Sequence, residues 1–521
     1  MVWRRILDAL NLGSARRARS GVLLSKTKYL IGLQCRKALW INYNNRALIP
    51  DLSAASLAIF EQGHEVGLLA QKLFPNGIDL GYIRDPNEAI SATKAQLAFR
   101  LPIFESALGF QNCFSRADIL VPLGEDNRWD VLEVKSSTDV KPVYLQDLAF
   151  QRYIYEGAGL AIRSCYVLYV NNAYVRNGPI NATAFFSRVD VTRDVVGLIP
   201  GVEANVRAML DIIALQSCPE IKISPHCNDP YECTLKPFCW KFLPRGNVLQ
   251  LRNGRKRRWE LLYRGIMRLQ DIPADFVLSD TQARQVATHR NEKPYVNVAA
   301  ITTFLNQLVY PLFFLDFETV QPAIPLYDQS RPYAKIPFQF SLDRIDFDGA
   351  QPRHFSFLAD GQFDPRPALL SHLRELLGPS GSIIGYNVAF EISCLHECSS
   401  MFPEYAAWLH SIEPRFMDLY TIFERFDYYH PSQNGNASLK TVLPILTGLS
   451  YDNLEIQEGD VAQREFLRVT LRDVPIDERL KVRAALEKYC AQDTGGLIAL
   501  VESLRKLVAR PTERPSLRAA S

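Results

Sequence analysis

Two apolar strand segments, far apart in the chain, carry acidic side chains that such strands normally exclude. VLEVK contains Glu133 and Lys135, and FFLDFETV contains Asp316 and Glu318. Residues two apart in a strand point to the same face, so each segment presents two polar side chains together. Burying charged groups is costly unless they are paired or bind a metal. The two segments therefore predict two sites, each built on a strand of a folded core.

The chain has 521 residues, which is too long for one ordinary core, so two or three domains are expected. Its formal charge of +3 means that any nucleic-acid surface must be local. No apolar run is long enough to span a membrane, and the basic first twenty residues lack a signal-peptide hydrophobic region. We expect a cytoplasmic protein, in which the ten cysteines are thiols or metal ligands rather than disulfides.

Strand-like and helical segments alternate in both halves, which predicts an α/β fold class. Strands are expected near residues 114–120, 129–134, 165–170, 311–320, 338–345 and 382–386. Helices are expected near 25–40, 56–74, 146–157 and 483–507. The expected organisation is a flexible basic extension (1–23), an N-terminal domain (24–245), a helical connector (246–305), a C-terminal domain (306–508) and a disordered tail rich in Pro and Arg (509–521).

The strand that carries Glu133 is expected to form a hairpin with the strand before it. Asp118 stands at the head of that earlier strand, and the hairpin would bring its carboxylate beside that of Glu133. Two carboxylates at that separation can bind Mg²⁺ or Mn²⁺, which prefer oxygen ligands. The metal would polarise a phosphate and lower the pKa of a bound water, and Lys135 would position that water or stabilise the developing charge. The alternative is a simple charge pair, the usual role of Glu-x-Lys on an exposed strand.

The helix that follows carries Gln151 and Tyr155, four residues apart on one face. Together with Asp118, Glu133 and Lys135, this pattern resembles the RecB-type branch of the PD-(D/E)xK nucleases, in which Gln-x-x-x-Tyr follows the Glu-x-Lys strand. The resemblance implies a restriction-endonuclease-like fold and catalytic roles for these five residues in the metal-dependent cleavage of nucleic acid.

The same resemblance implies a further metal ligand from an upstream helix, where that branch often has a His or a Glu. His64, in GHEVG, is the candidate here, and Glu61 and Glu65 are its rivals. Taken alone, a histidine of this kind is more often a surface residue than a ligand.

Four cysteines are expected to form one site. Cys227, Cys233 and Cys239 are spaced C-x5-C-x5-C, and Cys35 lies far upstream. The late cysteines lie among Asn, Asp, Pro, Glu and Lys, whereas a free cysteine is normally a small buried hydrophobe. The alternative is that the three late cysteines are ordinary thiols in a loop, without a ligand. The remaining cysteines are expected to be core or incidental thiols: Cys113, Cys165, Cys218, Cys394, Cys398 and Cys490.

One early and three late cysteines resemble the RecB-type nucleases that carry an iron–sulfur cluster, including the CRISPR-associated members. The resemblance implies a [4Fe–4S] cluster that ties the two ends of the nuclease domain together, with Zn²⁺ as the alternative. The first gap in that family is C-x2-C, so the C-x5-C spacing here leaves the type of cluster open.

The second acidic strand is followed by two further motifs. IGYNVAFEISCL contains Glu391, and KYCAQDTGGL contains Tyr489 and Asp493, four apart on a helix. With Asp316 and Glu318, these carboxylates could converge on two metal ions, the arrangement that hydrolyses phosphodiesters, and Tyr489 would orient the attacking water. They resemble the DEDD exonucleases of the RNase H-like fold, in their Tyr-x-x-x-Asp variety.

The second centre departs from that family at one position, because Glu391 stands where the family usually has Asp. Its side chain is one methylene longer and could still reach a metal, and Asp418 in FMDLY is a candidate assistant. The alternative is an RNase H-like domain that binds nucleic acid without cutting it.

Together the halves resemble a bacterial family that fuses a RecB-type nuclease to an RNase H-like domain, which GNASLKTVLPIL and the step from Gly459 to Ala462 also fit. We expect a metal-dependent nuclease whose partner is nucleic acid, DNA rather than RNA, with a second, 3′-to-5′ exonuclease centre. One rival is a nucleic-acid-binding clamp with one or both centres inactive. Another takes the four cysteines as a zinc site in a structural or adaptor protein.

Overall fold

A computed structural model describes residues 23–124 and 126–509. The chain divides into two compact units, each with its own sheet. The first unit comprises the described part of Met1–Lys241 together with Pro322–Tyr333, and the second comprises Phe242–Gln321 and the described part of Ala334–Ser521. Both units are therefore discontinuous in sequence.

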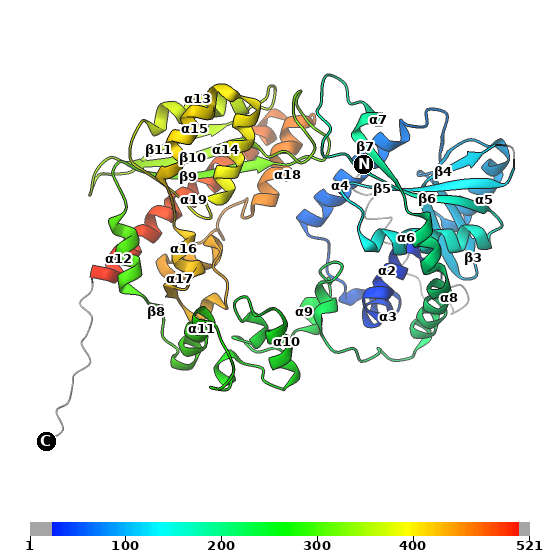
Figure 1. The fold of residues 1–521 in the computed structure, drawn as a ribbon, viewed down its shortest axis with the longest axis horizontal. Helices are drawn as coiled ribbons and strands as arrows, with labels where there is room; N and C mark the ends of the chain where they lie inside the picture. Colours follow the sequence, from blue (N-terminus) through cyan, green and yellow to red (C-terminus); the bar gives the residue numbers. More distant parts are fainter. Residues whose placement is uncertain (1–22, 125, 510–521) are drawn as a thin grey trace. The chain divides into compact units, whose positions relative to one another are not determined.

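The sheet of the first unit has the strand order β2-β3-β4-β5-β6-β7, and a short parallel pairing adds β1 to β4. Its strands are β1 (Leu24–Ser25), β2 (Ile78–Asp79), β3 (Ile103–Phe110), β4 (Cys113–Leu123), β5 (Arg128–Lys135), β6 (Ala161–Val170) and β7 (Phe186–Asp190). Its helices are α2 (Lys26–Gln34), α3 (Arg36–Asn44), α4 (Ala54–Gln71), α5 (Pro86–Gln96), α6 (Pro142–Gly157), α7 (Ala182–Phe185), α8 (Thr192–Ala214) and α9 (Lys236–Cys239) (Figure 1).

Strand alternation gives this sheet two apolar faces, each covered by helices. Ile119 and Leu132 belong to a core cluster with Val66 and other residues of α4. Their neighbours Leu120 and Val131 point to the opposite face and pack with residues of α6 and α8. Strand β5 pairs with both β4 and β6, and core clusters cover both faces of the sheet, so its apolar run is buried. A polar side chain on β5 must therefore find its partners inside the protein.

The segment Pro322–Tyr333, here called the strap, leaves the end of β9 and folds with the first unit. Ala323 is fully buried in the core cluster on the α4 side of the sheet, and its backbone N–H donates to Gln62 Oε1 at 2.9 Å. The Arg176 guanidinium donates to the carbonyls of Pro325 and Leu326 at 2.9 and 2.6 Å. The strap therefore completes the core of a unit that precedes it in sequence.

The larger sheet of the second unit has the order β11-β10-β9-β12-β13, and β8 pairs with β14 in a separate ribbon. Its strands are β8 (Tyr295–Val296), β9 (Leu312–Val320), β10 (Ile336–Ile345), β11 (Arg353–Leu358), β12 (Ser382–Gly385), β13 (Phe416–Asp418) and β14 (Tyr428–Tyr429). Its helices are α10 (Arg255–Tyr263), α11 (Asp280–Asn291), α12 (Val298–Asn306), α13 (Arg366–Leu377), α14 (Ala389–Met401), α15 (Ala406–Ile412), α16 (Tyr420–Glu424), α17 (Leu439–Thr447), α18 (Gly459–Leu471) and α19 (Ile476–Ala509) (Figure 1).

Alternation along β9 separates core from site in the second unit. Phe313, Leu315 and Phe317 belong to a cluster with apolar residues of α13, α14 and α15 on one face of the sheet. The opposite face of β9 and β10 is covered by the long helix α19. Asp316 and Glu318 alternate with the core residues, so they lie on the face that α19 covers.

The α/β class is confirmed in this general form, and the expected strands and helices correspond to elements of the structure. The expected helix over 25–40 is interrupted, because Cys35 is extended (φ −155°, ψ 116°) and separates α2 from α3. Strand β3 has no counterpart among the expected strands, and Asp118 lies in the middle of β4 rather than at its head. The expected connector, 246–305, carries α10 and α11 within the second unit and reaches into α12.

Residues 1–22 of the expected extension and 510–521 of the expected tail lie outside the described residues. Across 23–124 and 126–509, none of the helices is both long enough and apolar enough to cross a membrane.

Candidate functional site

The first candidate centre lies on the face of the sheet that α6 covers. The hairpin of β4 and β5 is confirmed, and its register places Asp118 opposite Glu133, since Ile119 pairs with Leu132. Asp118 Oδ2 accepts a hydrogen bond from the Val134 N–H at 2.6 Å, which fixes this carboxylate across the hairpin. The carboxylates expected to bind a metal therefore come from paired positions on neighbouring strands.

Glu133 is only 1% exposed and is held by charged and amide partners. Lys135 Nζ donates to Glu133 Oε1 at 2.6 Å, and Gln151 Nε2, from α6, donates to Glu133 Oε2 at 2.6 Å. Lys26, at the start of α2, donates to both oxygens of Glu133 at 3.0 and 3.1 Å. Lys26 was not among the expected residues, because nothing in its local sequence indicates the distant strand that it contacts.

Asp147 of α6 is a third carboxylate of this centre that sequence reasoning missed. It is 2% exposed, and its oxygens lie 3.0 Å from Lys135 Nζ, 3.6 Å from Lys26 Nζ and 3.2 Å from Gln151 Nε2. A signal was present in the sequence, since Asp147 precedes Gln151 by four residues and so shares its helix face. We call Asp118, Glu133, Asp147, Lys26, Lys135 and Gln151 the first centre.

Glu105 approaches the first centre from β3. Phe104 pairs with Ile119 and Ser106 with Ala117, so Glu105 lies opposite Asp118. Its φ is 53°, in the left-handed region that a glutamate rarely adopts within a strand. Such backbone strain is concentrated at functional sites, where the surrounding structure maintains it. Burial raises the pKa of Glu105, and the charges of Lys26 and Arg116 oppose that rise.

Charge at the first centre is shared between the carboxylates and the lysines. Burial opposes ionisation of Glu133, but the charges of Lys135 and Lys26 outweigh it and hold its pKa well below the usual range. Burial raises the pKa of Asp118 to about 8, and the negative charge of Glu133 acts in the same direction. Two lysines thus keep Glu133 ionised without a metal, while Asp118 holds a proton that a divalent cation would displace.

Tyr155 and His64, two other expected site residues, differ from the first centre in their surroundings. The Tyr155 hydroxyl accepts from the Ala117 N–H at 3.0 Å and donates to the Ser106 carbonyl, so Tyr155 ties α6 to β3 and β4. His64 is exposed on α4, and its charge acts on the neighbouring Glu65.

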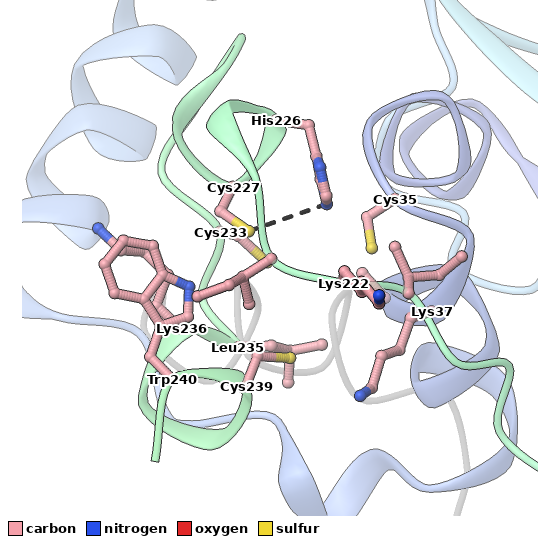
Figure 2. A pocket seen from close by; sticks show the side chains of 13 residues that line it. Cys35, Lys37, Lys222, His226, Cys227, Cys233, Leu235, Lys236, Cys239 and Trp240 are labelled. Carbon is pink, nitrogen blue, oxygen red and sulfur yellow. Dashed lines mark hydrogen bonds between the residues drawn. The ribbon is translucent and has the colours of Figure 1, made fainter. Parts of the chain in front are cut away.

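The four expected cysteines line one cavity of the first unit, together with lysines and an aromatic ring. Figure 2 shows Cys35, Cys227, Cys233 and Cys239 around this cavity. The three late cysteines come from the loop before α9 and from α9 itself, and the extended backbone at Cys35 brings the early one to them. Sequence reasoning grouped these residues correctly. We call them the cysteine site.

The chemistry of this donor set fits a metal. Burial raises the pKa values of the Cys233 and Cys239 thiols, and the neighbouring cysteines act in the same direction. A bound metal reverses this effect, because coordinated thiols lose their protons. Lys37, Lys222 and Lys236 also line the cavity and can offset the negative charge that four thiolates retain around a cluster or Zn²⁺.

The second candidate centre joins β9 to α19. Asp316, Glu318 and Asp493 offer carboxylate oxygens that all lie within 4.8 Å of one another. Glu318 and Asp493 are 8% and 6% exposed. Burial and mutual repulsion hold the pKa values of Asp316 and Glu318 well above their usual range, and burial raises that of Asp493 to about 6. A cluster of this kind fits a divalent cation, whose charge would relieve the repulsion. We call these three residues the second centre.

Glu391 lies outside this group of three, although its charge acts on Asp316. It is 5% exposed, and its Oε2 has no hydrogen-bond partner among the described residues. Burial raises the pKa of Glu391 to about 8. A buried carboxylate oxygen without a hydrogen-bond partner is costly, and burial favours the protonated form of this group. The structure thus brings Asp316, Glu318 and Asp493 together and leaves Glu391 at the edge.

Tyrosines and one lysine surround Asp493. The Tyr451 hydroxyl donates to Asp493 Oδ1 at 2.5 Å, a contact that sequence reasoning missed because Tyr451 lies in a loop before α18. The ring of Tyr489 lies 6.1 Å from that of Tyr451, centre to centre. Lys440 Nζ lies 5.5 and 5.3 Å from the two ring centres, and its charge lowers the pKa values of Glu318 and Asp493.

Asp418 has a structural position at the end of β13. Its Oδ1 accepts hydrogen bonds from the backbone N–H groups of Asn387 and Tyr420 at 2.8 and 3.0 Å. Asn387 adopts a φ of 67°, and this bond secures the turn that leads into α14, the helix of Glu391. Asp418 therefore positions the backbone near Glu391.

Comparison with known proteins gives relatives without a named activity. Residues 313–438, which include Asp316, Glu318 and Glu391, match a family described as a domain of unknown function (DUF2779). The chain is 27% identical over 226 residues to the uncharacterized protein MG366 of Mycoplasma genitalium, covering 39% of this chain and 33% of that protein. It is 26% identical over 206 residues to the MG366 homolog of Mycoplasma pneumoniae, covering 36% and 31%. The chain thus spans about a third of the length of these relatives.

Proposed function

We propose that the protein is a metal-dependent nuclease whose first centre hydrolyses phosphodiester bonds, as a RecB-type PD-(D/E)xK nuclease does. The observation that carries this proposal is the convergence of two lysines and one glutamine on the buried Glu133, with Asp118 at the opposite position on β4. A buried ion pair is weak evidence of a stabilising role. Groups with strongly shifted pKa values of opposite sense are typical of catalytic sites.

In this proposal each residue has a distinct task. Asp118 and Glu133 would hold a divalent cation, and Glu105 on β3 and Asp147 on α6 would complete or orient its surroundings. Bound Mg²⁺ or Mn²⁺ would polarise the scissile phosphate and lower the pKa of a water. Lys135 carries the positive charge that stabilises the phosphate oxygens as the bond breaks. Gln151 fixes the orientation of Glu133 from α6.

The cysteine site supports the same assignment by its composition. Four thiolates suit a [4Fe–4S] cluster or tetrahedral Zn²⁺. Either would tie α2 and α3 to the loop before α9, and so hold together segments that are almost 200 positions apart in sequence, Cys35 and Cys227. Visible absorption and iron analysis of anaerobically purified protein distinguish the cluster from zinc.

A second activity, 3′-to-5′ exonuclease cleavage in an RNase H-like unit, is favoured by the three clustered carboxylates of the second centre. A mixed sheet that carries Asp316 and Glu318 on its central strand β9, with Asp493 on α19, supports this proposal. Tyr489 lies on the same helix as Asp493, one turn before it, where it could orient a water. Glu391 reaches the edge of this group, so a second ion would need its side chain to move.

The test is cleavage of end-labelled single- and double-stranded DNA and RNA with Mg²⁺ or Mn²⁺. Wild type is compared with Lys135→Ala and Asp316→Ala, and with two control substitutions of exposed residues, Lys141→Ala and Glu375→Ala. Removing a group that stabilises the transition state should lower kcat by roughly 10²–10³-fold at its own centre. The pattern of loss assigns each product to a centre.

A clamp gives a different outcome in the same assay. Wild type would then bind the strands with no metal-dependent product, and the enzymatic proposal would be abandoned in favour of nucleic-acid binding with inactive centres. A protein that neither binds nor cuts, but contains stoichiometric zinc, would favour the adaptor alternative.

A further inference from the structure

Side chains of the protein use every acceptor position of the Glu133 carboxylate. An ionised carboxylate offers about four lone-pair positions on its two oxygens. Oε1 accepts hydrogen bonds from Lys135 Nζ at 2.6 Å and from Lys26 Nζ at 3.0 Å. Oε2 accepts hydrogen bonds from Gln151 Nε2 at 2.6 Å and from Lys26 Nζ at 3.1 Å. A divalent cation can therefore bind Glu133 only if one of these donors moves away.

Lys26 is the donor that contacts both oxygens of this carboxylate. Its Nζ also lies 3.6 Å from Asp147 Oδ1. An ammonium group has three N–H donors, so the three carboxylate oxygens around Lys26 Nζ use its whole capacity. Glu133 belongs to β5 and Asp147 to α6, so one cation joins acidic side chains of a strand and a helix. The Lys26 ammonium group thus lies between carboxylates to which the proposed function assigns the surroundings of the metal.

The backbone of Lys26 is anchored, whereas its side chain is long and partly open to solvent. Ser25, the residue before it, pairs with Phe114 of β4. The Ser25 hydroxyl caps α2 by accepting a hydrogen bond from the Lys28 N–H at 3.4 Å. The Lys26 side chain is 21% exposed and carries its charge on a flexible four-carbon stem. The ammonium group can therefore leave Glu133 while α2 stays in place.

The other two donors of Glu133 have additional contacts that hold them. Gln151 is fully buried on α6, and its Nε2 also donates to Asp147 Oδ1 at 3.2 Å. Lys135 lies on the same strand as Glu133, and its Nζ is 5.0 Å from the ring centre of Tyr144. Departure of either donor would free a position on one oxygen only. Departure of Lys26 frees a position on each oxygen of Glu133.

Exchange of Lys26 for a divalent cation would leave a positive charge without its partner. The metal brings two positive charges to carboxylates that the ammonium group had neutralised in part, and the displaced ammonium group remains attached to α2. A phosphodiester carries one negative charge, and lysine is a common phosphate ligand in proteins. A phosphate beside the metal would therefore restore the charge balance and give the displaced ammonium group a new partner.

We propose that Lys26 is a resident cation of the first centre, which is displaced by the divalent metal and then binds the substrate phosphate beside Lys135. This inference rests on the proposed nuclease function, because that function supplies both the metal and the phosphate. Lys26 then contacts the substrate, and binding of metal and binding of phosphate assist each other. By linkage, phosphate must raise the affinity for metal by the same factor by which metal raises the affinity for phosphate.

The first experiment measures Mn²⁺ affinity by titration calorimetry on the full-length protein. The Asp316→Asn/Glu318→Gln background removes two of the three clustered carboxylates of the second centre, so that Mn²⁺ binding reports the first centre. Lys26→Met should bind Mn²⁺ about 10- to 100-fold more tightly, the scale on which groups that contact metal ligands change metal affinity. Gln151→Leu, which removes another partner of Glu133, should bind Mn²⁺ more weakly.

The opposite signs expected for Lys26→Met and Gln151→Leu separate displacement from orientation. If Lys26 only orients Glu133, its loss weakens Mn²⁺ binding, and that result overturns the proposal, as does an unchanged affinity. Lys28→Met is the matched control on the same helix, because Lys28 donates to Asn42 rather than to a carboxylate of the first centre. Its Mn²⁺ affinity should equal that of the background protein.

A second experiment follows Lys26 in the wild-type chain, so it does not depend on whether Lys26→Met folds. Brief acetylation with acetic anhydride is quantified at each lysine by mass spectrometry. Mn²⁺ at a saturating concentration should raise the rate at Lys26 severalfold, because the released ammonium group reaches solvent. Thymidine 3′,5′-bisphosphate, which has no phosphodiester bond to cleave, should lower that rate again. The rate at Lys28 should respond to neither, and a rate at Lys26 that Mn²⁺ leaves unchanged or lowers overturns the proposal.

The outcomes distinguish this inference from the proposed function. Tighter Mn²⁺ binding by Lys26→Met, together with the expected changes in acetylation of Lys26, supports the exchange even if the wild type cuts no nucleic acid. A protein that cuts in the preceding assay, but in which neither Mn²⁺ affinity nor acetylation responds at Lys26, keeps the nuclease assignment and excludes the exchange.

Discussion

The two candidate centres are both built from buried Asp and Glu side chains, but their electrostatic surroundings are opposite. The first centre places two lysines directly against Glu133 and Asp147, so its charges are largely balanced by the protein. The second centre groups three carboxylates, and the lysine whose charge acts on them, Lys440, is exposed and lies over tyrosine rings. The first is thus prepared to fold without a divalent cation, whereas the second retains a charge conflict that only protons or a metal can relieve.

The largest expected effect is on the free energy of unfolding, and it tests the charge balance at the first centre. Lys26→Met removes one of the two cations and leaves the buried Glu133 and Asp147 with Lys135 as their remaining lysine partner. Breaking a buried ion pair in this way typically costs about 3–5 kcal/mol of unfolding free energy. Chemical denaturation of the metal-free protein measures it, and Mn²⁺ should recover part of the loss.

A matched control for this prediction lies two residues away. Lys28, on the same helix, donates to Asn42, and burial lowers its pKa to about 8, with the positive charge of Arg46 acting in the same direction. Lys28→Met should therefore cost far less than Lys26→Met. Equal losses would mean that the helix start, rather than charge balance, determines the stability.

The second effect concerns metal and pH at the second centre. Its carboxyl groups have raised pKa values in the folded state, so the folded protein binds more protons than the unfolded chain. Metal-free stability must then fall as pH rises above the unfolded pKa near 4, with the Asp493 contribution complete near pH 6 and those of Asp316 and Glu318 continuing above it.

Mn²⁺ should therefore raise the melting temperature more at pH 8 than at pH 6, with a stabilisation of about 3 kcal/mol at 100 times its Kd. Asp118 titrates in the same direction, with a pKa of about 8. The double variant Asp316→Asn/Glu318→Gln isolates the second centre, because the slope due to Asp316 and Glu318 should be lost while that due to other carboxyl groups with raised pKa values, such as Asp118 and Glu391, remains. A metal response independent of pH would contradict the charge conflict inferred there.

The third expected effect is a gain in stability, which is the opposite of the usual result of a substitution at a buried polar site. Asp493→Asn removes one of three repelling carboxylates, so the metal-free protein should gain about 2 kcal/mol at pH 8, less any loss of the Tyr451 hydrogen bond. Differential scanning calorimetry in EDTA measures this. Glu133→Gln is the comparison at the first centre and should destabilise the protein, since Glu133 is paired with both lysines. The same sign for both variants would remove the distinction between the centres.

The smallest expected effect is on metal affinity. It is tested at the two side chains that orient a carboxylate, one in each centre. Tyr451→Phe removes the hydrogen bond to Asp493, and Gln151→Leu removes that to Glu133. Partners of this kind typically contribute a factor of 10 or more to metal affinity, about 1.4 kcal/mol. Titration calorimetry with Mn²⁺ should show a weaker site in each variant, and unchanged affinity in either would assign that residue a purely structural role.

The sequence predicted those parts of each site that depend on regular periodicity. Glu133 and Lys135, or Asp316 and Glu318, are two apart in strands, and Tyr489 and Asp493 are one helical turn apart, so their grouping follows from the element itself. The cysteines were found because their spacing and polar surroundings differ from those of core thiols. What was missed depends on contacts between distant elements.

Lys26 and Tyr451 show why such contacts are hidden. Lys26 is one of several lysines near a helix start, and only the folding of α2 against α6 and β4 makes it a partner of Glu133. Glu105 was missed with its whole strand, and its left-handed backbone has no signature in sequence. His64 was suggested by a family pattern alone, and its side chain is exposed on α4, so its role as a ligand stays a prediction.

The strap has a consequence for how this molecule can be divided. Pro322–Tyr333 belongs to the first unit, yet in sequence it follows strand β9 of the second unit. No single break in the chain therefore separates two whole units. A gene truncated after Lys241 would encode a first unit without Ala323 in its core and without Tyr333 beside Ser136. A single protease cut, recombination breakpoint or fragment boundary between the units would therefore leave the first unit incomplete. We expect the two centres to be inherited, lost and purified together.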